Sequence, residues 1–139
     1  MFFTINTSDS LPIYEQLVRQ ITYAIAGQIL RPGQLLPSVR QLSVELAINP
    51  NTVARAYQQL QQEDILESLR GRGLAVRAGA TENCRQMRRE LISQRLHTAL
   101  SEARQSGLAQ TEIKNLVEQH LQALSTSTPP GDEVDRGVQ

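Results

Sequence analysis

Several polar residues near position 50 have side chains that could bond to the edges of DNA bases. Asn49, Asn51, Thr52 and Arg55 lie around the start of a segment in which apolar residues recur at helical spacing. An asparagine amide can make two hydrogen bonds to an adenine edge, and an arginine guanidinium can do the same to guanine. Taken alone, the asparagines could instead cap a helix, and Arg55 could be a solvated surface group. The neighbouring motifs favour the first interpretation.

Two other basic places could contact the DNA backbone or a groove. Arg40 lies beside Ser38 in the first turn of a predicted helix, where free backbone N–H groups and the helix dipole attract a phosphate. The run Arg70-Gly71-Arg72-Gly73 is a predicted turn, because its glycines permit positive φ. Its arginines suit the negative potential of a minor groove. The alternatives are a solvent-exposed Arg40 and an ordinary basic turn.

Apolar spacing predicts three helices ahead of that turn. Apolar residues recur every four positions at Ile13, Leu17, Ile21 and Ile25, which predicts a first helix. This helix is expected to end near Gly27. Ser38 and Gln41 form a capping box that opens a second helix. After a short break, a third helix begins at Asn49 or Asn51, with Pro50 in or just before its first turn.

A β-hairpin is predicted next, because two strand-like runs, 65–69 and 74–77, flank the glycine turn. Two short helices joined by a tight turn form a helix-turn-helix, and a hairpin directly after it makes a winged helix. The expected fold is therefore mainly α with a small β-hairpin. Residues 1–79 are expected to form this winged helix-turn-helix domain, with extended backbone at 1–11 and 35–36.

The C-terminal part has the pattern of two amphipathic helices, over 82–105 and about 111–124, separated by Ser106-Gly107. They are too short to bury a core alone, so residues 80–125 are predicted to be a helical dimerisation segment. The alternative is that they fold back onto their own winged helix. The predicted dimer interface consists of Met87, Leu91, Leu96, Leu100, Ile113, Leu116, Val117, His120 and Leu121. Residues 126–139 are expected to be a disordered tail that ends the chain naturally.

The order of these motifs resembles the DNA-binding domain of the GntR family of transcriptional regulators. The resemblance extends over roughly residues 10–78 and rests on 14–17, 27–29, 31–42, 49–57 and 71–73. The run Asn49-Pro50-Asn51-Thr52-Val53 and the short helical C-terminus resemble the YtrA-like subfamily in particular.

The resemblance implies a homodimeric regulator, expected to be a repressor that binds an inverted-repeat operator in double-stranded DNA. It implies that Arg40 contacts DNA, that 49–55 form the reading helix and that the turn at 71–73 enters the minor groove. Many family members have arginine where this chain has Pro50 and Ala54, so their operator sequences do not transfer. The predicted DNA-binding set is Ser38, Arg40, Asn49, Asn51, Thr52, Arg55, Tyr57, Arg70, Gly71, Arg72 and Gly73.

Composition argues against several other classes. Cys84 is the only cysteine and the two histidines lack metal-binding spacing, so neither a disulfide nor a metal or other cofactor is expected. The apolar runs are too short to span a membrane, and we expect a cytoplasmic protein without a membrane partner. The sequence contains no supported nucleophile–base pair and no phosphate-binding loop, so we do not expect an enzyme.

Net charge supports a rival interpretation. The chain carries 14 basic and 14 acidic residues, whereas nucleic-acid-binding proteins usually have a basic excess. A winged-helix module that binds a protein instead of DNA is therefore the alternative function. An unidentified small-molecule effector is also left open as a partner, because no residue pattern identifies a site for one.

Overall fold

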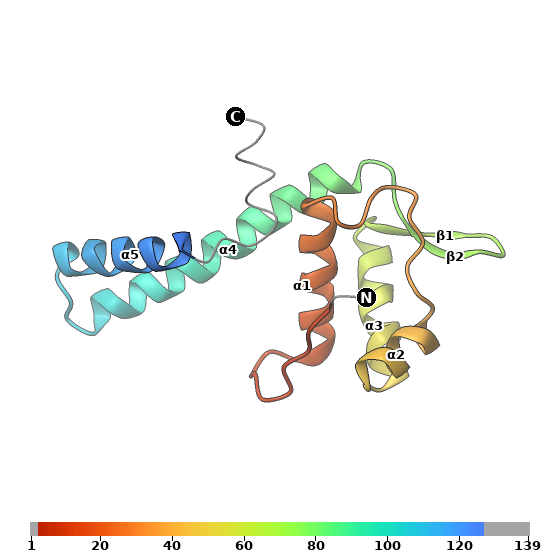
Figure 1. Ribbon diagram of the computed structural model, residues 1–139, viewed down its shortest axis with the longest axis horizontal. Coiled ribbons are helices and arrows are strands. Elements are labelled where there is room, and N and C mark those ends of the chain that lie inside the picture. The colour runs from red at the N-terminus through yellow and green to blue at the C-terminus, as the bar shows by residue number, and fades with distance from the viewer. Residues whose placement is uncertain (1–2, 127–139) are drawn as a thin grey trace. The chain divides into compact units, whose positions relative to one another are not determined.

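The structure, a computed structural model, describes residues 3–126. Two compact units divide between Arg89 and Glu90. The elements in chain order are α1 (Ile13–Ala26), α2 (Val39–Leu46), α3 (Pro50–Gln62), β1 (Leu66–Leu69), β2 (Gly73–Val76), α4 (Ala80–Gln105) and α5 (Gln110–Ser125). The element types match the sequence prediction, and helices dominate (Figure 1).

The core of the first unit lies between α1, α2 and α3. The predicted stripe of α1 is confirmed, since Leu17, Ile21 and Ile25 are all fully buried. Leu42 of α2 and Leu60 of α3 complete this core with no exposed surface. Burial of these apolar side chains is the main force that holds the three helices together.

The turn between α2 and α3 gives the helix-turn-helix its geometry. The predicted capping box is present at the start of α2: Ser38 Oγ accepts from Gln41 N at 3.0 Å, and Gln41 Oε1 accepts from Ser38 N at 2.9 Å. Ala47 ends α2 in the left-handed conformation, with φ 55°. Asn49, one of the two predicted caps, is the N-cap of α3, with Pro50 at the first helical position.

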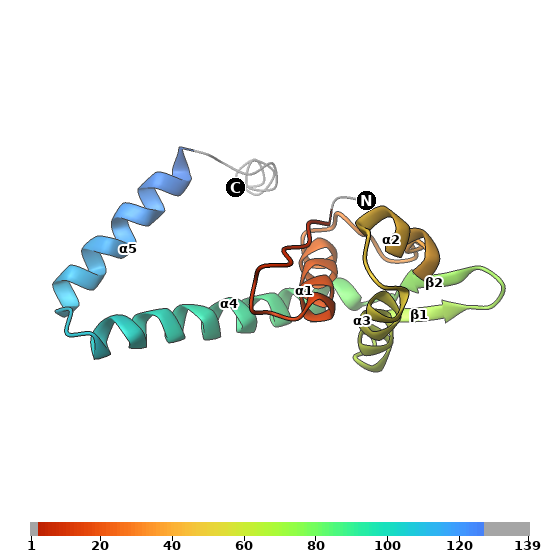
Figure 2. The same cartoon turned by 90° about the horizontal axis from the view of Figure 1, so that it is seen from below.

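The wing is a two-stranded antiparallel hairpin with a third segment beside it. β1 and β2 pair from Leu66↔Val76 to Leu69↔Gly73. On the other edge of β2, Val76 N donates to Gln34 O at 2.9 Å and Leu36 N donates to Leu74 O at 2.8 Å. The predicted extended stretch at 35–36 is thus confirmed, and it holds the wing against the helices (Figures 1 and 2).

The backbone of the N-terminal segment forms hydrogen bonds with side chains of α1 and not with a neighbouring strand. No strand forms between residues 3 and 12. Gln16 Oε1 accepts from Asn6 N, and Gln16 Nε2 donates to Asn6 O, each at 2.9 Å. Gln20 makes the same two kinds of bond to the backbone of Thr4. Two side-chain amides of α1 therefore replace the backbone partner that an extended segment needs.

The first turns of α4 belong to the first unit. Ala80 and Cys84 are buried, and Met87 packs against the same core. Arg85 Nε donates to Ala26 O at 3.2 Å, at the end of α1. Burial, with a contribution from Glu63, raises the pKa of the Cys84 thiol to about 11. The helix starts at Ala80, ahead of the predicted start at residue 82.

The second unit contains the rest of α4 and the whole of α5. The predicted break is confirmed: Gly107 takes positive φ after Ser106. No side chain of α5 is buried among the described residues. The expected tail, 126–139, lies outside the described residues except for Thr126, which follows α5.

Candidate nucleic-acid interface

The outer face of α3 carries the side chains predicted to read bases. Val53, Ala56 and Leu60 face the core, so the spacing of an α-helix turns Asn51 and Arg55 to the opposite face, where both are exposed. Asn49 Oδ1 accepts from Asn51 N at 2.8 Å and so serves as a cap. Its amide N–H₂ stays available, and the same residue can thus both cap and contact DNA.

Arg55 has a neighbour, Tyr14, that no sequence pattern assigned to the site. Its guanidinium carbon lies 3.7 Å from the centroid of the Tyr14 ring on α1. Tyr14 Oη donates to Glu15 Oε1 at 3.0 Å. Tyr14 belongs to the motif that carries the family resemblance, but periodicity placed it beside the apolar stripe of α1 and gave no signal of a contact with α3.

Tyr57 is a correction to the predicted DNA-binding set. Its side chain is buried, and its hydroxyl donates to Pro37 O at 2.7 Å. Burial, and more weakly Glu45, raises the pKa of the Tyr57 phenol well above its usual value. A phenol enclosed in this way cannot reach DNA, so Tyr57 connects α3 to the segment before α2. Thr52, also in the set, is half-buried.

The start of α2 presents Arg40 to solvent. Ser38 uses its oxygen in the capping box, which leaves its O–H free to donate. Arg40 is exposed one residue into the helix, near backbone N–H groups that have no partner within the helix. This arrangement suits contact with an anion such as a phosphate.

The tip of the wing exposes Arg70 and Arg72. Gly71 and Gly73 take φ of 75° and 110°, a region that side chains rarely adopt, and open space surrounds the Cβ position of each. Arg72 N donates to Leu69 O at 2.9 Å and closes the turn. The glycines therefore allow a narrow basic tip.

Local charge resolves the apparent conflict with zero net charge. Within residues 3–126, none of Arg40, Arg55, Arg70 and Arg72 is in an ion pair. Arg77, at the base of the wing, instead pairs with Asp64 at 3.0 Å. The cations expected at DNA thus have no ion-pair partner among the described residues, although the chain as a whole has as many acidic as basic residues.

Residues 3–126 contain neither a candidate metal centre nor a candidate membrane-spanning helix. No group of three or more His, Cys, Asp or Glu residues in the described part comes close enough to hold a metal ion. Within that part, no helix has both the length and the apolar character to cross a bilayer.

A helix-turn-helix followed at once by a hairpin, with basic and amide side chains on the second helix and the tip, defines the winged helix-turn-helix class of DNA-binding domain. The family model described as "Bacterial regulatory proteins, gntR family" matches residues 13–76. The HTH-type transcriptional repressor YtrA of Bacillus subtilis is 36% identical over 104 residues, which are 75% of this chain and 80% of that protein. The chain belongs to the GntR family of DNA-binding transcriptional regulators.

Solved structures agree with this assignment. A GntR family transcriptional regulator from Listeria monocytogenes superposes with a TM-score of 0.67 at 30% identity, covering 81% of this chain and 97% of that one. YtrA from Sulfolobus acidocaldarius, a GntR-family transcription factor, gives a TM-score of 0.53 at 28% identity and covers 88% and 98%. The similarity thus extends beyond the winged helix and includes the C-terminal helices.

Proposed function

We propose that this regulator is a cytoplasmic homodimeric repressor that binds an inverted-repeat operator. The observation that carries the proposal is the outer face of α3, where Asn51 and Arg55 are exposed; the wing tip adds Arg70 and Arg72, which form no ion pair within residues 3–126. One such helix reads only a few base pairs, so strong specificity needs two copies on two half-sites.

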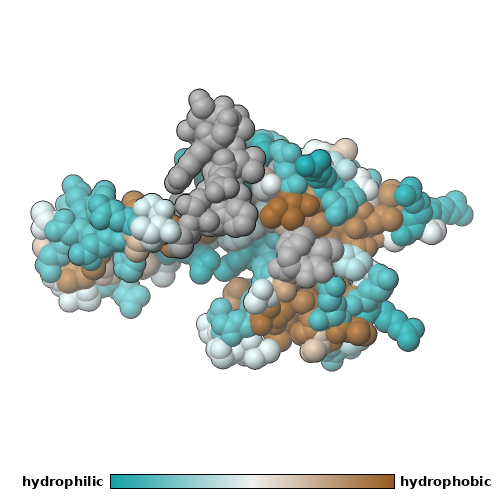
Figure 3. Space-filling view, viewed as in Figure 1, coloured by the Kyte–Doolittle hydropathy of each residue, from teal (hydrophilic) through white to brown (hydrophobic). Residues whose placement is uncertain are grey.

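The second unit supplies the proposed dimer interface. Several large apolar side chains of α4 and α5 are exposed, including Leu96 at 53%, Leu121 at 57% and Leu124 at 64%. Apolar atoms interrupt the hydrophilic surface of these helices (Figure 3). Of the predicted interface residues, Leu91, Leu100 and Ile113 are half-buried and His120 is exposed. Since two helices of this length cannot bury a core alone, a second copy is the proposed cover.

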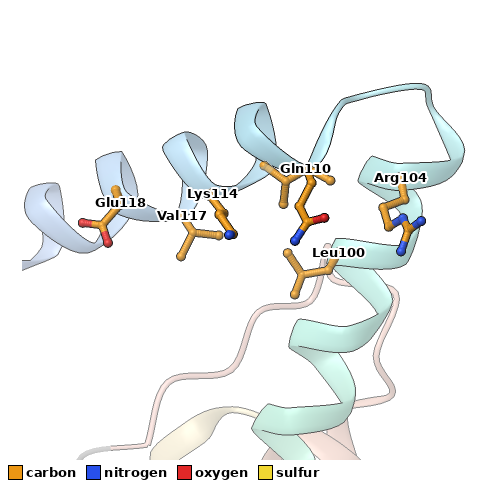
Figure 4. Close-up of a pocket in the computed structure, with 7 residues that line it drawn as sticks. Leu100, Arg104, Gln110, Lys114, Val117 and Glu118 are labelled. Carbon is orange, nitrogen blue, oxygen red and sulfur yellow. The ribbon is translucent and has the colours of Figure 1, made fainter.

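A groove of about 400 Å³ between α4 and α5 is part of this surface. Leu100 of α4 and Ile113 and Val117 of α5 form its apolar part, and Arg104 and Lys114 lie beside them (Figure 4). A side chain of the partner copy would bury these apolar groups. An effector, where one acts, would change the relative orientation of the two DNA-binding units by binding one arrangement of the dimer better than another.

Selection from random DNA tests the proposal. Purified protein is mixed with a pool of random duplexes at about 0.15 M salt, where purely electrostatic binding is already weakened, and the retained DNA is sequenced. Enrichment of an inverted repeat is the expected result. Enrichment of a single half-site would contradict the proposal that a dimer binds two half-sites. No enrichment by a folded protein would favour the protein-interaction module.

Substitution of three arginines separates the two functions directly. In the variant with Arg40→Ala, Arg55→Ala and Arg72→Ala, a DNA-binding regulator loses its affinity for the selected duplex. A module that binds another protein has no reason to depend on all three. The double substitution Arg88→Ala/Arg89→Ala, at two exposed positions of α4, is the control, and it should leave DNA affinity nearly unchanged.

A further inference from the structure

We propose that Tyr14 is a positioning residue for DNA recognition, because its ring holds the guanidinium of Arg55 in a fixed direction before DNA arrives. This inference rests on the proposed operator binding and assigns a role to a residue of α1, outside the helix-turn-helix. The Arg55 guanidinium carbon lies over the Tyr14 ring, 3.7 Å from its centroid, and this contact carries the inference.

The stack occupies the faces of both groups and leaves the edge of the guanidinium free. A guanidinium carries its five N–H donors in its own plane, so a ring against its face takes none of them away. These donors remain available for a guanine edge or a phosphate. Arg55 is exposed, and within residues 3–126 no acidic side chain forms an ion pair with it. Tyr14 therefore orients Arg55 without competing for its hydrogen bonds.

The hydroxyl of Tyr14 has a separate role. It donates to the Glu15 carboxylate at 3.0 Å, so the contact with Arg55 is made by the ring. Donation to a carboxylate also makes the ring more electron-rich, which strengthens its attraction for a cation. Phenylalanine at this position should consequently retain most of the effect, and an aliphatic residue of similar size should lose it.

Preorganisation is the physical reason for a gain in affinity. A free arginine side chain has many rotamers, and it loses this freedom when it binds. In this chain α1 and α3 are packed on a shared core, so the stack restricts Arg55 in the free protein. The loss of freedom on binding is then smaller. The stack adds affinity only through the contacts that Arg55 makes with DNA. Binding to the specific operator should therefore depend on the stack more than non-specific binding does.

The binding experiment compares Tyr14→Leu, Tyr14→Phe, Arg55→Ala and the double variant Tyr14→Leu/Arg55→Ala at one salt concentration. Fluorescence anisotropy measures affinity for the selected duplex and for one with scrambled half-sites. We expect Tyr14→Leu to weaken specific binding about three- to fivefold, and to change scrambled binding little. Tyr14→Phe should lie within about twofold of wild type, and Tyr14→Leu should have no further effect once Arg55 is alanine.

Tyr23→Leu is the matched control, because Tyr23 is a half-buried tyrosine of the same helix whose hydroxyl has no hydrogen-bond partner within the described residues. It should leave DNA binding as in wild type, and thermal unfolding confirms that each variant is folded. A loss for Tyr14→Leu that persists undiminished in the Arg55→Ala background would overturn the proposal. So would equal losses for Tyr14→Phe and Tyr14→Leu.

A spectroscopic measurement tests the stack without DNA. In protein with ¹⁵N-labelled arginine, the Arg55 Nε–H proton should be shifted upfield by the Tyr14 ring current. The shift should disappear in Tyr14→Leu and persist in Tyr14→Phe. An unshifted proton in wild type would overturn the proposal. If the wild-type protein shows the shift but enriches no DNA sequence in the selection, the stack exists and the operator proposal is wrong. The role of the stack in recognition would then be wrong as well.

Discussion

At the scale of single residues, two arginines of the wing have different surroundings. Arg72 is exposed at the tip and forms no ion pair within residues 3–126, whereas Arg77 at the base pairs with Asp64 at 3.0 Å. An unpaired cation can exchange its counterions for a phosphate, but a paired one must first give up its carboxylate. The two positions therefore form a natural comparison.

Arg72→Ala should weaken binding to all DNA sequences, and should reduce the slope of log affinity against log salt by about 1. Arg77→Ala, the matched control, should change that slope little. Anisotropy titrations at four salt concentrations measure both slopes. Equal effects of the two substitutions would contradict a special role for the tip.

Tyr57→Phe tests the role that the structure gives to Tyr57. The substitution removes the hydrogen bond to Pro37 O, so the free energy of unfolding should fall by about 1 kcal/mol. DNA affinity should remain close to wild type, because the ring is buried and cannot reach a base. Urea unfolding gives the first quantity and anisotropy the second. A large loss of affinity in a stable protein would restore Tyr57 to the DNA-binding set.

Sequence predicted the residues of the site whose role depends on near neighbours in the chain. The capping pairs Ser38 with Gln41 and Asn49 with Asn51 are local, as are the glycines of the wing. The stack of Arg55 on Tyr14 was missed, because it depends on how α1 and α3 pack. Tyr57 was assigned to DNA through a motif, although its helical position already placed it inward.

At the scale of elements, the turn after α2 uses a residue that is not suited to it. Ala47 takes φ 55°, which no sequence pattern indicated. Gln28, after α1, and Asp64, after α3, also take positive φ, each at 60°. Local propensity favours glycine or asparagine in this conformation, so the surrounding packing must impose it. The core side chains Leu42 and Val53 on either side of the turn are fully buried and fix the ends of both helices.

Ala47→Gly should raise the free energy of unfolding by up to about 1 kcal/mol, because glycine adopts positive φ without steric strain. Ala78→Gly is the control: Ala78 also lies in a turn but is not among the residues with positive φ. That change should be neutral or destabilising. Thermal unfolding of both variants decides the matter, and an equal response would show that strain at Ala47 is negligible.

The packing of α4 on the first unit buries the Cys84 thiol, and this burial predicts how the free energy of unfolding depends on pH. Burial raises the pKa of Cys84 from 9.0 to about 11. The folded state thus holds this proton more tightly than the unfolded state, so stability is complete below pH 9 and is lost as the pH rises towards 11. The loss should be on the order of 2 kcal/mol.

Urea unfolding at several pH values between 7 and 11 measures this dependence. Cys84→Ala should show a smaller decline between pH 9 and 10 than the wild type. A residual decline is expected from Tyr57, whose pKa is also raised by burial. A curve for Cys84→Ala with the same slope as wild type would contradict the assignment to the thiol.

At the scale of the whole molecule, the two units differ in how they are stabilised. The first has a core of fully buried side chains, and the second exposes the apolar faces of α4 and α5. Sequence periodicity indicated both helices and their break, because these features are local. The limit of the first unit was not evident from sequence, since Cys84 and Met87 join its core through contacts with distant residues.

Charge on the exposed face of α5 should dissociate the proposed dimer. Leu116→Glu with Leu121→Glu places two carboxylates where apolar side chains would otherwise be buried by a partner. We expect a monomer in sedimentation equilibrium and a loss of affinity for the inverted repeat of at least about 100-fold. Gln122→Glu, an exposed change on the same helix, should remain dimeric. A double variant that stays dimeric would place the interface elsewhere.

The lack of any buried side chain on α5 has a consequence for protein turnover. An isolated helix of this length is only marginally stable in water, and α4 alone covers little of α5, so we expect α5 of a single chain to open often and to be cut by proteases. A partner that covers it would slow this degradation. The lifetime of each molecule would then increase with the number of copies in the cell. Scarce regulator would be cleared quickly, whereas abundant regulator would persist.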